Sequence, residues 1–169
     1  MRCFIAIDLD PKLKPAVEKL QAELAGFDVK LVEPSNLHFT IKFLCEIDED
    51  LVNKVKDELQ RLVKGYEPFG IIIESVGTFP SEKLVRVVWL GAQPSDMYGR
   101  SFSLTDLQVK IDDCLSGLFK KEKPSPHLTI ARVRSQSYTD EIIKFVNRHK
   151  DDKIGAMHVR EIKLKKSIL

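Results

Sequence analysis

The sequence lacks most of the features that mark secreted or membrane-spanning proteins. It has three cysteines, Cys3, Cys45 and Cys114, an odd number with no CxxC pair, which indicates reduced, buried thiols in a cytosolic protein rather than a disulfide framework. No apolar run approaches the roughly 20 residues that a membrane span needs, and the apolar stretch at the N-terminus is too short for a signal peptide. We therefore expect a cytoplasmic protein with no membrane contact.

A large charge of one sign is also missing. The 27 Lys+Arg residues nearly balance the 25 Asp+Glu residues and leave a formal net charge of +2. Because nucleic-acid binding normally depends on neutralising phosphates, any anion-binding site must be local rather than spread over the surface. The 169 residues, 43% of them hydrophobic, suffice for one sizeable core but are few for two, so we expect a single domain over residues 1–169.

The apolar residues predict the same order of elements twice along the chain. In the first half they predict strands at 3–7, 37–44 and 69–76 and helices at 12–24 and 49–64; in the second half, strands at 84–90, 127–133 and 157–164 and helices at 104–118 and 139–150. Each half is therefore β-α-β-α-β, which indicates an internal duplication.

Alternating strands and helices favour a parallel sheet by default. Against that default, no glycine-rich phosphate loop follows the first strand, and the two halves match. We expect an α+β fold of two pseudo-symmetric lobes, whose antiparallel sheets face a central groove with the helices outside.

Two nearly identical tetrapeptides occur in the middle strands of the two halves. They are His38-Phe39-Thr40-Ile41 and His127-Leu128-Thr129-Ile130. Because side chains alternate along a strand, the histidine and the threonine of each motif point to the same face. If the lobes face each other, the two strands present two imidazoles and two hydroxyls to one groove.

These side chains suit a reaction at a phosphodiester. A neutral imidazole can take a proton from water while a protonated one gives a proton to a leaving alkoxide, and threonine hydroxyls can donate to the phosphate oxygens. A metal site is the alternative, but neither motif has a third histidine, cysteine or carboxylate at ligand spacing, so we expect no metal or other cofactor. We expect His149 to cap a helix end or be solvated, and His158 to be structural.

The segments HFTIKFLCE and SPHLTIAR resemble the paired motifs of the two-histidine phosphoesterases, in particular the RNA 2′,3′-cyclic phosphodiesterases once described as 2′-5′ RNA ligases. The first and last strands, RCFIAIDL and EIKLKKSIL, resemble the same family, so the likeness spans the chain. The resemblance implies that His38 is the proton donor and His127 the proton acceptor, and that Thr40 and Thr129 contact the phosphate. The implied reaction opens RNA or nucleotide 2′,3′-cyclic phosphates to 2′-phosphomonoesters, and we expect a monomer.

The resemblance also points to the positions five residues after each histidine. Phe43 and Arg132 match residues suited to stacking on a substrate base. In a regular strand these positions face away from the histidine, so each strand must bulge, twist or end before them. Otherwise Phe43 is a core residue and Arg132 a surface ion-pair partner. In a regular strand Lys42 shares the histidine face, as a phosphate-attracting charge or a solvated rim residue, and so does Ala131.

Three other functions remain open from the sequence. ATP-independent joining of RNA ends through a 2′-5′ linkage uses the same chemistry, with a ribose hydroxyl in place of water. A non-catalytic RNA- or nucleotide-binding module would hold the phosphate without turnover, although both motifs are intact here. The substrate could also be a small cyclic nucleotide or a 2′-5′-linked oligonucleotide, because the motifs recognise the phosphate and not the attached chain.

Overall fold

The computed structural model describes residues 1–97, 99 and 101–167, and the elements found in them follow the predicted order except for an additional short strand at Val29–Leu31 and two strands in place of the last one. The helices are α1 (Lys14–Leu24), α2 (Glu49–Val63), α3 (Leu104–Cys114) and α4 (Thr139–His149). The strands are β1 (Arg2–Asp8), β2 (Val29–Leu31), β3 (His38–Glu46), β4 (Phe69–Pro80), β5 (Val85–Ser95), β6 (Leu128–Val133), β7 (Lys153–Val159) and β8 (Lys163–Lys166). Short 3-10 turns are η1 (Pro11–Leu13), η2 (Pro34–Asn36) and η3 (Gln136–Tyr138). The four predicted helices are present, although α3 ends earlier than expected.

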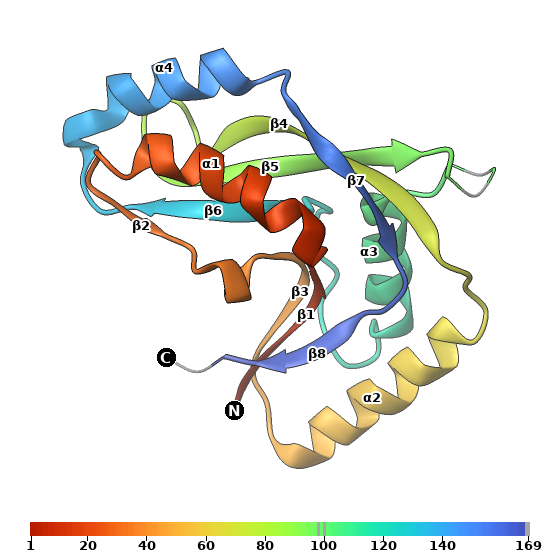
Figure 1. Cartoon of the computed structure of the whole chain (residues 1–169). Coiled ribbons are helices and arrows are strands. Elements are labelled where there is room, and N and C mark those ends of the chain that lie inside the picture. The colour runs from red at the N-terminus through yellow and green to blue at the C-terminus, as the bar shows by residue number, and fades with distance from the viewer. Residues whose placement is uncertain (98, 100, 168–169) are drawn as a thin grey trace.

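The strands form an antiparallel sheet in two arms, which confirms the α+β class (Figure 1). The strand order is β7-β4-β5-β6-β3-β1-β8, with β2 also paired to β6. β3 and β6 meet through one residue pair, Phe39 with Leu128. This junction separates a small arm, β3-β1-β8, from a large arm, β6-β5-β4-β7.

The two halves of the sequence exchange their last strands. β4 belongs to the first half but pairs with β5 and β7, and β8 at the end of the chain pairs with β1. The predicted single strand at 157–164 was therefore wrong: the chain leaves the large arm after Val159 and joins the small arm at Lys163. Helices also pack on strands of the opposite half: α1 packs on β6, and α3 packs on β3. Each half thus completes the arm that carries the other half's histidine strand.

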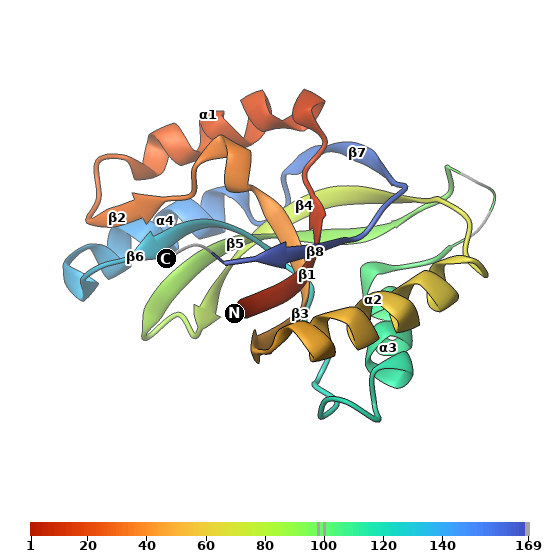
Figure 2. The ribbon, with the colours of Figure 1, turned by 90° about the horizontal axis from the view of Figure 1, so that it is seen from below.

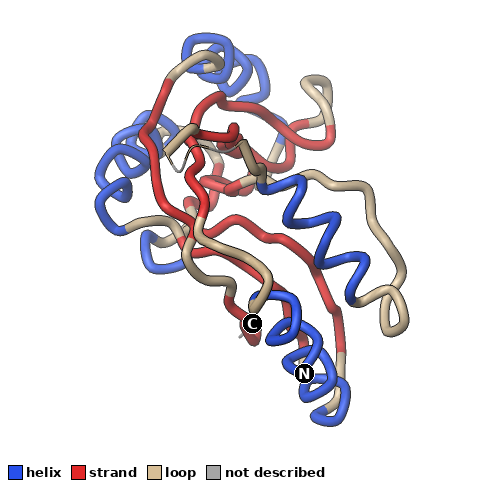
Figure 3. The backbone as a smooth tube through the Cα atoms, turned by 90° about the vertical axis from the view of Figure 1, so that its right-hand side faces the viewer, coloured by secondary structure: helices blue, strands red, loops and turns tan. Residues whose placement is uncertain are grey.

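The helices lie around the outside of the strands in two groups (Figures 2 and 3). α1 lies beside α4 along the large arm, and α2 lies beside α3 at the other end of the molecule. The apolar faces of these helices cover one face of the sheet, and between helices and sheet residues such as Ile5, Phe39 and Ile130 are fully buried. In the described ranges, no helix is long and apolar enough to cross a membrane.

His149 joins α4 to α1 instead of capping a helix or being solvated. Its Nε2 lies 3.1 Å from Glu23 Oε2 in α1, its Nδ1 lies 2.6 Å from Asp152 Oδ2, and its side chain is 13% exposed. Desolvation opposes its charge, but the hydrogen bonds to Asp152 and Glu23 outweigh it and raise the pKa of His149. The pair of helices is therefore held in part by a histidine that is charged at mildly acidic pH.

The cysteines are free thiols, but they are not all buried. Cys3 is buried, Cys114 is partly buried, and Cys45 is exposed. Cys45 takes a left-handed backbone conformation, with φ of 58°, next to an irregularity in the pairing of β3 with β1, which turns it away from the core. The expectation of a buried thiol was wrong at this position.

Candidate active site

The two histidines of the paired motifs lie where the two arms of the sheet meet. His38 begins β3, and His127 directly precedes β6. Since the junction pairs Phe39 with Leu128, the residue after each histidine faces its counterpart across an antiparallel pair. Both histidines line one groove of about 480 Å³, together with the threonines of the two motifs. The sheet thus brings together two pairs of side chains, one from each half of the sequence.

Each imidazole is oriented by a backbone carbonyl two residues earlier. His38 Nδ1 lies 2.6 Å from the carbonyl oxygen of Asn36, and His127 Nδ1 lies 2.7 Å from that of Ser125. A carbonyl oxygen can only accept, so Nδ1 carries the proton in both rings. Nε2 is then the nitrogen that gains or loses a proton. The two rings present the same nitrogen for acid–base chemistry.

An aromatic side chain packs against each imidazole. The ring centre of Phe4, in β1, lies 5.1 Å from that of His38. The ring of Phe79, in β4, meets His127 edge-on with its centre 4.8 Å away. Together with the carbonyl contacts, these rings restrict how far either imidazole can turn.

The environment of His38 disfavours its charged form. Desolvation by burial lowers the pKa of His38, and the charge of Lys165 adds to this, while the hydrogen bond to the Asn36 carbonyl opposes it. In the role that the resemblance implies, that of proton donor, His38 must be charged before it acts. The negative charge of a phosphate bound in the groove would act in the opposite direction and favour the imidazolium.

Of the three alternatives that the sequence left open, a bulge, a twist or a strand end, both histidine strands contain a bulge. Ile41 in β3 and Ile130 in β6 are each an extra residue, without a counterpart in the pairing with β1 and β5. Each lies three positions after its histidine, and each is buried together with the residue that follows it, Lys42 or Ala131. Two consecutive inward side chains reverse the alternation, so the fifth position after the histidine returns to the groove face.

Phe43 and Arg132 consequently line the groove with the histidines and threonines. Phe43 is 56% exposed, which excludes the alternative of a core residue, and its ring centre lies 6.3 Å from that of Phe4. Arg132 is exposed in β6, between Lys30 of β2 and Val87 of β5. An aromatic ring from β3 and a guanidinium from β6 thus line one groove.

The same bulges overturn the prediction for Lys42 and Ala131. Both were expected on the histidine face, but both are buried, at 2% and 0% exposure. Lys42 therefore lies neither at the groove mouth nor on its rim. The regular alternation on which the prediction depended ends at the extra residue before each of them.

Several groove residues were missed by the sequence analysis. Lys30, Glu33, Asn36 and Val87 also line the groove. The first three come from β2 and the η2 turn, and three residues such as Val29–Leu31 are too few to show a strand period. β2 forms because the edge of β6 beyond the junction with β3 is open for pairing. In the described part of the chain, no three His, Cys, Asp or Glu side chains form a group that could hold a metal ion.

Comparisons with known proteins show which family the chain resembles along its length. Residues 7–89 match the family model described as LigT-like phosphoesterase. An RNA 2′,3′-cyclic phosphodiesterase of Methanothermobacter thermautotrophicus is 35% identical over 100% of this chain and 91% of its own length. One of Methanocaldococcus jannaschii is 37% identical over 100% of this chain and 92% of its own length.

Solved structures show the same fold. A Thermus thermophilus protein, TT0787, superposes with a TM-score of 0.81 at 24% identity, over 100% of this chain and 90% of its own. Escherichia coli LigT, crystallised with 3′-AMP, gives a TM-score of 0.71 at 23% identity, over 96% of this chain and 86% of its own. With full-length relatives above 30% identity and both histidine motifs in one groove, the chain belongs to the LigT-like phosphoesterases, the family of these RNA 2′,3′-cyclic phosphodiesterases.

Proposed function

We propose that this protein hydrolyses the 2′,3′-cyclic phosphate ends of RNA to 2′-phosphomonoesters, with a pair of histidines as acid and base. The observation that carries the proposal is one groove holding two imidazoles, each with Nδ1 held by a backbone carbonyl, and two threonines. The substrate follows from the relatives, which are RNA 2′,3′-cyclic phosphodiesterases by name.

In the proposed reaction the two histidines act on opposite sides of the phosphorus. Nε2 of neutral His127 takes a proton from water as the water oxygen bonds to phosphorus. The bond from phosphorus to the 3′ oxygen breaks, and Nε2 of charged His38 gives that oxygen a proton. Thr40 and Thr129 donate to the non-bridging oxygens, where negative charge accumulates. The phosphate remains on the 2′ oxygen, and each histidine ends in the protonation state in which the other began.

The terminal base would lie between Phe43 and Arg132. A base can stack on the exposed phenyl face, and a guanidinium adds cation–π attraction from the other side. Stacking of this kind accepts any base, so we expect little base preference.

Lys30 extends the groove toward the rest of the RNA chain. It pairs with Arg132 across β2 and β6 and is exposed, so two cations lie next to each other beyond the histidines.

We expect Lys30→Ala to lower kcat/KM about fivefold for a short RNA with a cyclic end, the worth of roughly one exposed charge contact. A nucleoside cyclic phosphate has no upstream phosphodiester and should be less affected. The fall of kcat/KM for the RNA with rising salt should also be less steep in the variant, by the equivalent of about one phosphate contact. Lys19→Ala, exposed on α1, is the matched control, and equal losses on both substrates would contradict the assignment.

The pH profile tests which histidine is the acid. We expect Lys165→Met to raise both the pH optimum and the peak of kcat/KM, because the charge of Lys165 lowers the pKa of His38. Without that charge, more His38 is protonated at any given pH. If His38 were the base, the optimum would still rise, but the peak would fall. The exposed neighbour Lys166→Met is the control, and the measurement is kcat/KM for a nucleoside 2′,3′-cyclic monophosphate across the histidine pH range.

The reaction itself is tested with a nucleoside 2′,3′-cyclic monophosphate and with a short RNA carrying the same end, in excess EDTA. The expected product is the 2′-phosphate. A 3′-phosphate product would contradict the assigned roles, loss of activity on chelation would indicate a metal site, and no turnover of either substrate would favour a binding module. Adding RNA with a free 5′ hydroxyl shows whether 2′-5′ joining competes with hydrolysis.

We further propose that residues 1–169 act as one domain, as a monomer in the cytoplasm. The exchange of β4 and β8 supports one domain, because neither arm is complete without the other half. The free cysteines are in keeping with a reducing compartment.

A further inference from the structure

A buried ion pair joins the strand of His38 to α3, and the proposed reaction does not use it. Lys42 Nζ lies 2.5 Å from Asp112 Oδ1, and the two side chains are 2% and 5% exposed. Lys42 reaches this position because the bulge at Ile41 turns it inward. Removing two charges from water is costly, and a pair of apolar residues in the same space is often at least as stable. Stability alone is therefore a poor explanation for this pair.

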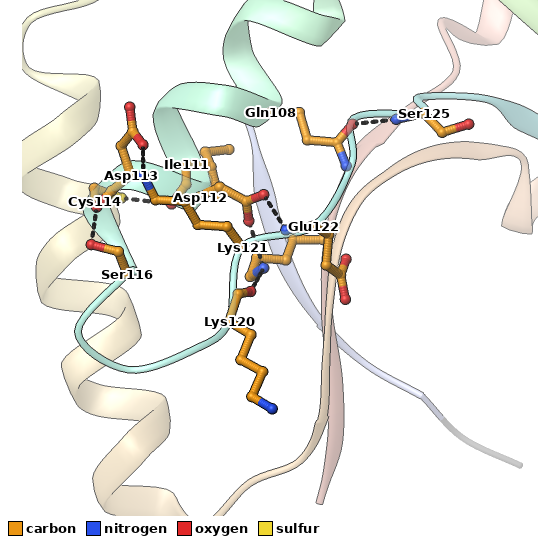
Figure 4. Close-up of polar contacts among 11 residues, drawn as sticks. Gln108, Ile111, Asp112, Asp113, Cys114, Ser116, Lys120, Lys121, Glu122 and Ser125 are labelled. Carbon is orange, nitrogen blue, oxygen red and sulfur yellow. Dashed lines mark hydrogen bonds and ion pairs between the residues drawn. The ribbon is translucent and has the colours of Figure 1, made fainter.

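The remaining polar atoms of the pair hold the segment that leads to His127 (Figure 4). Lys42 Nζ also donates to the carbonyl oxygen of Lys120 at 3.0 Å. Asp112 Oδ2 accepts from the backbone N–H of Glu122 at 2.9 Å. Residues 120–127 form no helix or strand. These two bonds therefore fix a backbone that has no regular secondary-structure hydrogen bonds to hold it.

A second buried side chain of α3 extends this support to His127 itself. Gln108 Oε1 accepts from the backbone N–H of Ser125 at 3.1 Å, and Gln108 is buried. The carbonyl oxygen of Ser125 is the atom that orients His127 Nδ1. Pro124 and Pro126 restrict the backbone on both sides of Ser125. The position of Ser125, and with it the direction of the imidazole, thus depends on α3.

We infer that Lys42, Asp112 and Gln108 are positioning residues that set the His127 imidazole relative to His38. The inference rests on the proposed function. Lys42 follows His38 on β3, so its ion pair fixes the strand of one histidine against the segment that delivers the other. Displacing a catalytic group by about 1 Å can cost on the order of a hundredfold in rate. The buried charges keep two groups in register that come from different halves of the chain.

The test separates positioning from stability by removing both charges together. The variant Lys42→Met/Asp112→Leu leaves no unpaired buried charge, and we expect it to unfold at a urea concentration no lower than the native protein. It nevertheless loses the bonds to Lys120 and Glu122, so we expect kcat to fall at least about tenfold, with KM changed less than about twofold. A double variant with native kcat would overturn the inference.

The matched control lies one residue further along α3. Asp113 Oδ1 is 2.5 Å from Lys121 Nζ, a pair between the same helix and the same segment, but with both side chains at least half exposed (Figure 4). We expect Asp113→Asn to keep native kcat and KM. A loss equal to that of the double variant would mean that any contact to this segment matters, which would overturn the specific role of the buried pair.

A readout independent of turnover keeps the inference separable from the proposed function. We expect Gln108→Met to shift the NMR signals of the His127 ring nitrogens from one Nδ1-protonated form toward a mixture of tautomers, while those of His38 stay unchanged. Unchanged His127 signals would overturn the inference, whether or not the native protein acts on a cyclic phosphate. If the native protein turns over neither substrate but the His127 signals shift, the positioning stands and the assigned reaction fails.

Discussion

Turnover of a nucleoside 2′,3′-cyclic monophosphate should fall at least about a hundredfold when either His38 or His127 is replaced by alanine. Each imidazole has one nitrogen held by a carbonyl and the other available for proton transfer, so neither ring can take over both roles. The loss should appear in kcat more than in KM, because the threonines and the other groove residues, which we propose to bind the phosphate, remain in place. The measurement is the initial rate with native protein and both variants in the same buffer with EDTA.

The double variant shows whether the histidines act as one unit. If they do, His38→Ala/His127→Ala loses little more than the worse single variant, because either loss already disables the concerted step. His158→Gln, an exposed histidine on β7 away from the groove, is the matched control and should keep native turnover. Retained turnover in one single variant would remove that histidine from the reaction.

The chemistry was predictable because it depends on residue type and short spacing. His-x-Thr fixes a shared face within one strand, and its repetition in the second half indicated that two such faces meet. The number of residues between the two motifs played no part in this prediction. The structure adds the contact that the sequence could not give, the pairing of Phe39 with Leu128 at the junction of the arms.

A bulge was one of three alternatives that the sequence left open, with a twist or a strand end, and its location was not predictable. Ile41 and Ile130 each stand two positions after an apolar residue, Phe39 or Leu128, as a regular strand requires, so nothing in the local pattern marks either as the extra residue. Their effect extends further than the groove. Lys42 looks like a surface residue by its type and spacing, and its partner Asp112 lies in α3, a helix of the other half of the chain. A buried charge can be identified only when the fold that pairs it is known.

The exchange of the last strands has a similar origin. The segment 157–164 has apolar residues through its length and reads as one strand, but Arg160 and Glu161 interrupt it between β7 and β8. Which neighbour a strand pairs with depends on the edge left open elsewhere. β1 and β5 each pair with a histidine strand on one side and leave the other edge open, and the last strand of the opposite half fills each of these edges. The twofold likeness of the halves is thus expressed in the whole sheet and not within either half.

Gly77→Ala should lower the free energy of unfolding by about 1–3 kcal/mol, the usual cost of forcing extra volume into a packed site. Gly77 pairs with Trp89 across β4 and β5, and a Cβ at this glycine would lie 2.2 Å from Trp89 Cζ2. The indole therefore occupies the space that any side chain would need. Urea denaturation of the variant measures the cost. Gly26→Ala, where a Cβ meets nothing within 4 Å, is the control and should differ little from the native protein.

The same substitution should also reach the catalytic groove. Trp89 packs on Phe79 with ring centres 5.1 Å apart, and Phe79 packs on His127. Displacing the indole therefore moves the ring that limits rotation of the imidazole, and we expect kcat to fall severalfold in folded protein. Adding Trp89→Leu to Gly77→Ala makes room for the new methyl group and should recover part of the stability. Because Phe79 then loses its neighbour, turnover should stay low. A double variant that recovers no stability would show that the methyl group added by Gly77→Ala does not clash with the indole.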